Sequence, residues 1–136
     1  MKKFIALLLT LICLLCIVGC SQQSQQVQST QLLAEGNVIK IAVSSLPEGY
    51  NYSFSGEDTK GIIDYLSNLN LQSKFDEDPN TYTGMTWVIS LEYENGDILT
   101  IYHFGNKFIC SENGSWYKMT DEEASHFDTL LDELSK

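Results

Sequence analysis

Residues 85–119 read MTWVISLEYENGDILTIYHFGNKFICSENGSWYKM, and three short turn sequences divide this stretch. The turns are Asn95-Gly96, Gly105-Asn106 and Asn113-Gly114, and each separates two runs that are rich in β-branched and aromatic residues. Asn-Gly supplies the positive φ angles that tight hairpins require. The stretch therefore predicts a four-stranded antiparallel meander, with strands at roughly 85–94, 97–104, 107–112 and 115–119.

The register of the meander follows from the first turn. If Asn95 and Gly96 are the two loop residues, Tyr93 lies opposite Ile98, and side chains then alternate between two faces. One face is large and aromatic, and we expect helices to cover it. Its members are Met85, Trp87, Ile89, Leu91, Tyr93, Ile98, Thr100, Tyr102, Phe104, Ile109 and Trp116.

The second face of the predicted meander is also partly apolar. Its members are Val88, Leu99, Ile101, His103, Phe108, Cys110 and Tyr117. An exposed apolar patch of this kind marks a binding surface, although a single bulge would redistribute the residues, and the segment from Leu46 to Phe54 could instead fold over them. Both explanations stay open. The candidate partner surface consists of Leu99, Ile101, His103 and Phe108, with Tyr50, Tyr52 and Phe54 from the preceding aromatic segment.

Two further helices and one strand are predicted around the meander. Val38–Val43 is β-rich and predicts a strand, while the segment 46–54 is either a loop or a short edge strand. Ser55 caps a helix expected from about Glu57 to Asn70, with Asn70 as its terminator. Thr120 and Glu123 have the spacing of a capping box at the start of a last helix.

These elements predict an α+β fold. The expected order is strand, helix, four-stranded meander, helix, which gives two layers: an antiparallel sheet with two helices on one face. After the N-terminal residues, the chain has enough length for one such domain, at 37–136.

The N-terminus has the features of a secretory signal. Met1-Lys2-Lys3 is positively charged, Phe4–Val18 is an apolar run shorter than the roughly 20 residues of a spanning helix, and Gly19-Cys20 closes it. This order resembles the lipobox of bacterial lipoproteins. The resemblance implies that a signal peptidase cuts between Gly19 and Cys20 and that the Cys20 thiol carries a diacylglycerol.

The alternatives to the lipobox interpretation are a plain signal peptide and a small membrane anchor. The resemblance divides the chain into a lipoprotein signal peptide (1–19), a lipidated Cys20 with a tether rich in glutamine and serine (20–36), and one extracytoplasmic domain (37–136). It places the protein on the outer face of the bacterial cytoplasmic membrane, attached through its lipid.

Charge excludes one class of partner. The chain has 8 Lys and Arg residues against 18 Asp and Glu residues, a net charge of −10, and all 8 basic residues are lysines. Nucleic-acid binding needs a basic surface that neutralises phosphates, so we expect no nucleic-acid partner. Attraction to anionic lipid headgroups is equally disfavoured, so membrane attachment depends on the lipid chain.

Catalytic and metal-binding patterns are weak. Cys110 and His103 share a predicted face but do not lie opposite each other, and no activating base accompanies them. His126 follows Glu122 and Glu123 without the spacing of a zinc site. Asp76-Glu77-Asp78 lacks the alternating carboxylates of a calcium loop. We expect no enzyme activity, no cofactor and no metal.

The C-terminal part carries a second resemblance. Between Gly61 and Leu134, the series Asn-Gly, then Trp-Tyr-Lys-Met-Thr, then Glu-Glu-Ala resembles small uncharacterised lipoprotein domains of low-GC Gram-positive bacteria. That resemblance implies an accessory or sensing role. The expected function is therefore a lipid-anchored, non-enzymatic binding, accessory or sensing module for another envelope protein. The alternative is a lipoprotein that binds a small ligand or a divalent cation.

Overall fold

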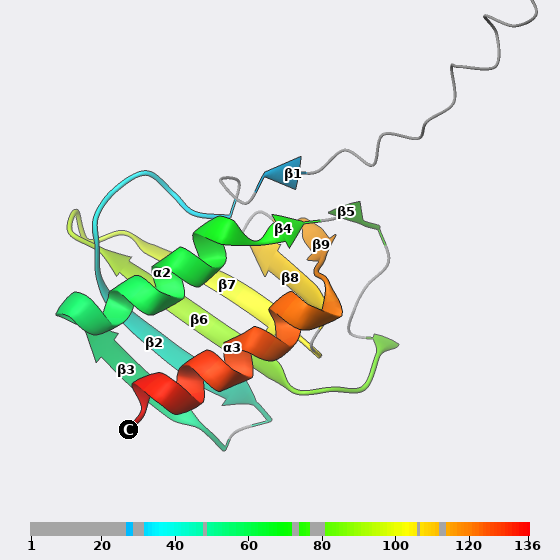
Figure 1. The fold of residues 1–136 in the computed structure, drawn as a ribbon. Helices are drawn as coiled ribbons and strands as arrows, with labels where there is room; N and C mark the ends of the chain where they lie inside the picture. The colour runs from blue at the N-terminus through cyan, green and yellow to red at the C-terminus, as the bar shows by residue number, and fades with distance from the viewer. Residues whose placement is uncertain are drawn as a thin grey trace, which may run out of the picture.

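The structure is a computed structural model that describes residues 27–28, 32–47, 49–71, 74–76, 81–105, 107–111 and 114–136. The signal segment and Cys20 lie outside these residues. The described chain has an α+β fold with a seven-stranded antiparallel sheet and two α-helices (Figure 1), which confirms the predicted fold class at that level.

The elements follow one another from strands to helix to sheet to helix. Three strands precede the first α-helix, where the sequence predicted one and left a second open, and two further strands of two residues each lie between that helix and the meander. The bounds are β1 (Val27–Gln28), β2 (Val38–Leu46), β3 (Asn51–Ser55), the 3-10 turn η3 (Gly56–Asp58), α2 (Thr59–Asn68), β4 (Asn70–Leu71), β5 (Lys74–Phe75), β6 (Thr86–Tyr93), β7 (Ile98–Phe104), β8 (Phe108–Ser111), β9 (Trp116–Lys118) and α3 (Asp121–Leu134).

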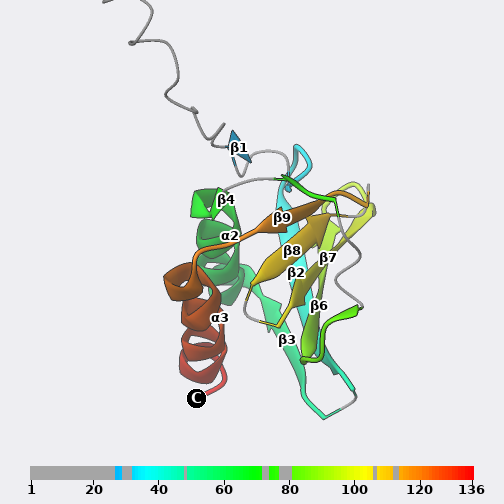
Figure 2. The same ribbon diagram turned by 90° about the vertical axis from the view of Figure 1, so that its right-hand side faces the viewer.

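The main sheet has the strand order β3-β2-β6-β7-β8-β9-β5, and β1 and β4 form a separate pair. All the pairs are antiparallel, so neighbours in the main sheet connect through hairpins except where β2 meets β6 and where β9 meets β5. Figure 2 shows α2 and α3 on the same side of this sheet. The side chains that point toward the helices form the core.

The core alternates along each central strand as a half-covered sheet requires. On β6 every second residue is buried, beginning with Trp87 and ending with Tyr93. Helix α3 contributes Ala124, Phe127 and Leu131, which are fully buried, while Leu130 and Leu134 pack against the core. The core residues buried to 1% exposure or less are Leu32, Ile41, Val43, Ile62, Leu66, Leu71, Ile89, Leu91, Ile101, Ile109, Met119, Ala124, Phe127 and Leu131.

The β6–β7 hairpin has a longer loop than predicted. The Tyr93 N–H donates to the Asp97 carbonyl at 2.9 Å, and the Gly96 N–H donates to the Tyr93 carbonyl at 2.9 Å. The loop is therefore Glu94-Asn95-Gly96, with Gly96 at φ 88° in the left-handed region that favours glycine. As a result, Ile98 pairs with Glu92 instead of Tyr93.

This shift reverses the faces of β7, because side chains alternate with a period of two. The prediction that Ile98 and Tyr102 face the helices was wrong: they are 61% and 37% exposed. Ile101 and His103 take their place and are fully buried opposite Ile89 and Trp87.

A second shift at the β7–β8 turn restores the predicted face of β8. Phe104 pairs with Phe108 there, so Ile109 lies opposite His103 and faces the helices as predicted. On β9 the prediction was wrong again, because Ile109 pairs with Tyr117 and Cys110 pairs with Trp116. Tyr117, and not Trp116, therefore lies on the helix side.

The far face of the sheet is partly covered, but not by the segment 46–54. Phe75 stacks on Phe108 with ring centroids 4.4 Å apart, and Tyr82 lies 5.6 Å from Phe108. Phe104, Phe108 and Cys110 are buried in this small second cluster. The segment 46–54 instead supplies β3, which settles that it is an edge strand.

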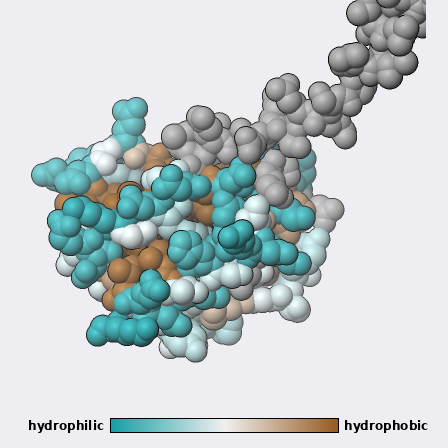
Figure 3. Space-filling view, viewed as in Figure 1, coloured by the Kyte–Doolittle hydropathy of each residue, from teal (hydrophilic) through white to brown (hydrophobic). Residues whose placement is uncertain are grey.

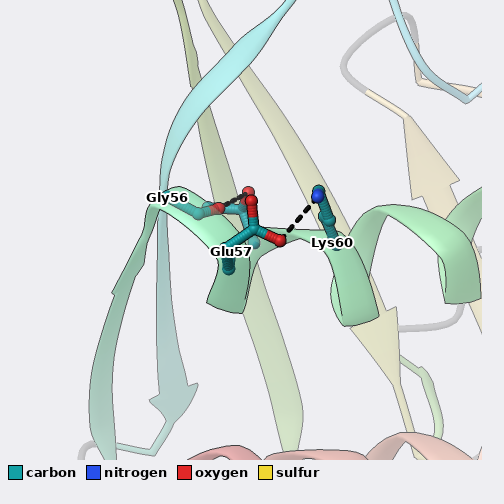
Figure 4. A network of polar contacts seen from close by, with 4 residues as sticks. Gly56, Glu57 and Lys60 are labelled. Carbon is teal, nitrogen blue, oxygen red and sulfur yellow. Dashed lines mark hydrogen bonds and ion pairs between the residues drawn. The ribbon is translucent and has the colours of Figure 1, made fainter.

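The helix ends match the predictions in part. Helix α2 begins later than predicted, after η3, and Lys60 pairs there with Glu57 (Figure 4). Ser55 has the extended backbone of a cap but makes no side-chain cap hydrogen bond. The prediction that Asn70 ends this helix was wrong, since Asn70 belongs to β4. The capping box of Thr120 and Glu123 is confirmed.

Candidate functional site

Four aromatic rings form a strip at the β3 edge of the sheet, on the side of the helices. We call Tyr50, Tyr52, Phe54 and Trp87 the aromatic strip. The rings of Tyr50 and Tyr52 are 6.5 Å apart and inclined by 5°, and those of Tyr52 and Phe54 are 6.2 Å apart and inclined by 14°. Trp87 lies against both tyrosines, at 5.8 and 6.2 Å. Alternation along one strand aligns three of the rings, and strand pairing brings Trp87 beside them.

The strip passes from buried to exposed along β3. Phe54 is 5% exposed and belongs to the core, Tyr52 is half-buried, and Tyr50 is 54% exposed. Trp87 is 6% exposed, and its indole N–H donates to Asp128 Oδ1 of α3 at 2.9 Å. The buried members hold the exposed rings in place, so the strip presents a rigid aromatic surface with a carboxylate beside it.

The strip adjoins an open strand edge. The Ser45 N–H donates to the Tyr50 carbonyl at 3.1 Å, and the pairing continues without a shift from Ser44–Asn51 to Lys40–Ser55. Hydrogen-bonded and non-hydrogen-bonded pairs alternate in an antiparallel ladder. The main-chain N–H and C=O groups of Asn51, Ser53 and Ser55 therefore point away from β2. Within the described residues no strand pairs with that side of β3.

Negative charge dominates the surroundings. Glu57 and Asp58 directly follow β3, and Asp128 adjoins the strip. The contact of Lys60 with Glu57 is the one salt bridge found in the described part of the chain. Few of the carboxylates are therefore neutralised locally, and the site attracts cations.

A separate polar network lies under the helices. The Tyr65 hydroxyl donates to the Glu123 carbonyl at 3.0 Å, so it accepts from His103 Nε2 at 3.1 Å. The imidazole stacks on Phe127 at 4.8 Å, and its Nδ1 is buried without a hydrogen-bond partner among the residues described. Burial lowers the pKa of His103 to about 4, against a smaller opposing effect of Asp128. Burial also raises the pKa of Tyr65, as do the nearby Glu123 and Asp128.

Four of the seven residues of the predicted partner surface are buried: Phe54, Ile101, His103 and Phe108. Ile101 and His103 are fully buried beneath the helices, and Leu99 packs against the core. Phe108 is buried on the opposite face beneath Phe75. The physical reason is the loop of the β6–β7 hairpin, which turned the even and odd positions of β7 over. The predicted residues that the structure does bring together at a surface are Tyr50, Tyr52 and, at its buried end, Phe54.

Cys110 and His103 do not form a pair. Cys110 lies opposite Tyr102, so its side chain points to the far face, whereas His103 points to the helices. Burial raises the pKa of the Cys110 thiol, and the side chain is 4% exposed. The prediction that they share a face was wrong, and this geometry gives the thiol no base.

The residues that were weighed and rejected as metal ligands from the sequence are only partly described. His126 lies on α3 with its ring edge toward Tyr65 at 5.9 Å, and Asp76 is exposed, while Glu77 and Asp78 lie outside the described residues. In the part of the chain that the structure covers, no three His, Cys, Asp or Glu side chains are grouped as metal ligands would be.

A shallow groove of about 270 Å³ lies between α2 and α3. Figure 3 shows a hydrophobic patch between these helices with hydrophilic residues around it. The groove is lined by Gly61, Asp64, Tyr65, Asn68, Leu69, Glu123, His126 and Leu130. Its floor is the Tyr65 ring, above the His103 network.

Comparison with known proteins identifies no relative of this chain. No family model matches the chain, and no curated protein and no solved structure matches it. None of the helices in the described residues has the length and apolar character to cross a membrane.

Two residues of the site were missed from the sequence. From the sequence, Trp87 is placed on the face that the helices cover, because its neighbours on β2 and β3 are unknown at that point, and Asp128 is not among the predicted site residues. Alternation of Tyr50, Tyr52 and Phe54 at every second position was the available signal. It would have placed their rings on one face of an edge strand.

Proposed function

We propose that this protein is a lipid-anchored, non-enzymatic binding module on the outer face of the bacterial cytoplasmic membrane, and that the aromatic strip is the surface with which it engages another envelope protein. The observation that carries the proposal is the exposure gradient of the strip. Tyr50 and Tyr52 are partly exposed and rest against the buried Trp87. Tyrosines that are rigidly held and partly exposed are typical anchors of protein interfaces, because they offer large contact area at low entropic cost.

The lipobox resemblance supports the location. A Cys20 lipid and a tether rich in glutamine and serine (21–36) would hold the domain near the membrane while leaving it free to turn. The acidic charge supports a protein partner over nucleic acid, as phosphates would be repelled.

The absence of enzyme activity is part of the proposal. Nucleophilic catalysis needs a base within hydrogen-bond reach of an accessible nucleophile. The buried Cys110 and the buried His103 lie on opposite faces of the sheet, and the exposed His126 contacts a tyrosine ring. These arrangements favour a binding role.

Photo-crosslinking in cells tests the proposal. A photoreactive residue replaces Tyr50 in the full-length protein, and a matched probe replaces Ile98, which is as exposed but lies on the opposite face of the sheet. We expect a discrete protein adduct from position 50 and none from position 98. Equal adducts from both positions, or none from position 50, would contradict the proposal.

The groove between α2 and α3 favours a second candidate, the binding of a small ligand. Its volume is close to the lower limit of small-molecule sites, and its apolar walls carry a few polar groups such as Asp64 and His126. Leu130→Trp fills this groove from α3. Native ligand that co-purifies with the wild-type protein, but not with this variant, would support the second candidate.

A further inference from the structure

We propose that β3 accepts an extended, lysine- or arginine-bearing segment of the partner protein as an additional strand of the sheet. This inference rests on the proposed function, because it names how the partner meets the aromatic strip. It starts from a difference between the two edges of the sheet.

The two edges differ in how well they are protected. Sheet edges are usually shielded by short strands, charged residues, proline or bulges, because an open edge pairs with other chains. The β5 edge has two residues, one of which is Lys74. The β3 edge has five residues, Asn51–Ser55, with no charge and no proline, and its pairing to β2 contains no bulge. The β3 edge is therefore a template for an added strand.

The backbone of β3 has the correct phase for such an addition. The outward N–H and C=O groups belong to Asn51, Ser53 and Ser55, whose side chains are exposed on the far face. A strand added here would place alternate side chains on the helix side, within about 5 Å of the strip residues that they face. Main-chain bonds would supply affinity and the strip would select side chains.

Charge identifies the occupant. Side chains that face Tyr50 and Tyr52 would also lie near Asp128, which Trp87 holds in place. A cation over a tyrosine ring gains from both the ring and the carboxylate. Asp58 also follows the strand and acts in the same direction, whereas the neighbouring Glu57 is already paired with Lys60. A basic extended segment fits this environment better than an acidic or apolar one.

Two other occupants fit less well. A second copy of the chain would bring two molecules of net charge −10 together at their acidic edges. The chain's own N-terminal segment reaches the domain at β1, which pairs with β4 and lies far from β3 in both views (Figures 1 and 2).

Hydrogen exchange on the lipidated full-length protein in detergent micelles tests the inference. The probe is an eight-residue peptide of alternating lysine and threonine, and the control peptide has glutamate in place of lysine. At a lysine-peptide concentration about ten times Kd, we expect about tenfold slower exchange at Asn51, Ser53 and Ser55. The glutamate peptide should leave these amides unchanged.

A pair of variants separates main-chain from side-chain effects. Ser53→Pro removes an outward N–H, whereas Ser53→Ala keeps it and removes only the hydroxyl. We expect Ser53→Pro to weaken the lysine peptide about tenfold, as loss of one or two main-chain hydrogen bonds would, and Ser53→Ala to bind like the wild type. Should Ser53→Pro fail to fold, the amide exchange of the wild-type protein still decides the question.

Several results would overturn the strand addition. Lysine-peptide binding that leaves these amides unprotected would mean that the partner contacts the strip alone. Concentration-dependent protection without any peptide would identify a second copy as the occupant. If the glutamate peptide bound as well as the lysine peptide, or if the lysine peptide did not bind, the proposal that the occupant is a basic segment would be wrong. An adduct from the probe at position 50 whose yield Ser53→Pro leaves unchanged would reject the strand addition and leave the proposed function standing.

Discussion

At the residue scale, His103 shows how a buried imidazole couples the fold to pH. It sits between the Tyr65 hydroxyl and the Phe127 ring, and protonation would place an unpaired charge beneath the helices. The folded pKa of about 4 lies below the ordinary value of 6.5. The unfolded state therefore binds more protons between these pH values, and stability is lost as the pH falls through this window.

Replacing His103 should remove this pH dependence. The wild-type free energy of unfolding should fall by at most about 3 kcal/mol between pH 6.5 and 4 on account of this residue. In His103→Phe, which keeps a ring against Phe127, that part of the slope should vanish. Urea unfolding across the pH range measures it. His126→Gln, on the exposed side of α3, is the control and should keep the wild-type slope.

Substitutions at the two ends of the aromatic strip should differ in their effect on the free energy of unfolding. Tyr50→Ala changes an exposed side chain and should alter the free energy of unfolding by less than about 0.5 kcal/mol. Phe54→Ala empties a core position and should cost about 3 kcal/mol. Thermal or urea unfolding compares them. If Tyr50→Ala proved as destabilising as Phe54→Ala, the exposed end of the strip would have a structural role instead.

At the scale of elements, the Glu123 carboxylate joins two parts of the fold. Its Oε2 accepts from the Thr120 N–H at 3.1 Å, which closes the capping box of α3. Its Oε1 accepts from the Asn70 N–H at 2.5 Å, just beyond the end of α2. One carboxylate therefore fixes the start of α3 against the chain that leaves α2.

Because of this double role, Glu123→Ala should destabilise the protein more than Thr120→Ala. Loss of the threonine cap costs about 1 kcal/mol, and Glu123→Ala should cost about 2 kcal/mol since it frees two main-chain donors. Urea unfolding is the measurement, with the exposed Glu122→Ala as a near-neutral control. Equal losses for Thr120→Ala and Glu123→Ala would show that the Asn70 contact contributes nothing.

The positions of the elements were predictable from the sequence, but the register between the strands was not. Periodicity and capping signals located the meander, both helices and the Thr120–Glu123 box. They could not give the register, because Asn95-Gly96 fits a two-residue loop and equally the longer loop with Gly96 at positive φ. Both sets of β7 residues are apolar, so burial could not be deduced from pattern. The choice is made by packing against α3, where His103 meets Phe127.

The candidate site was only partly predictable for the same reason. Aromatic spacing identified Tyr50, Tyr52 and Phe54. The predicted positions of Ile101 and His103 were wrong, because they depended on the predicted register of the β6–β7 hairpin. Trp87 and Asp128 join the site through contacts between residues 41 positions apart in the chain. Such long-range contacts follow from the topology of the sheet and have no local signal.

At the scale of the whole molecule, the proposed function requires a lipid on Cys20 that tethers the domain to the membrane. Intact-mass measurement on protein extracted from membranes should find a mature chain that starts at Cys20 and carries a diacylglycerol. Cys20→Ser should remain as the unprocessed precursor, because the thiol that receives the lipid is missing. A Cys20→Ser protein that is cut as efficiently as the wild type, with no lipid on either protein, would instead indicate a plain signal peptide.

The most direct measurement of the central claim is hydrogen exchange of the anchored protein in its native membranes, compared with the same protein purified in detergent. We predict that exchange in membranes is slower along Asn51–Ser55, where a partner covers the open edge and the aromatic strip, and unchanged along β7, which is paired on both sides within the sheet. Slower exchange confined to α2 and α3 would point to their groove instead. No difference between the two samples would contradict the proposal that this edge of the sheet holds a partner.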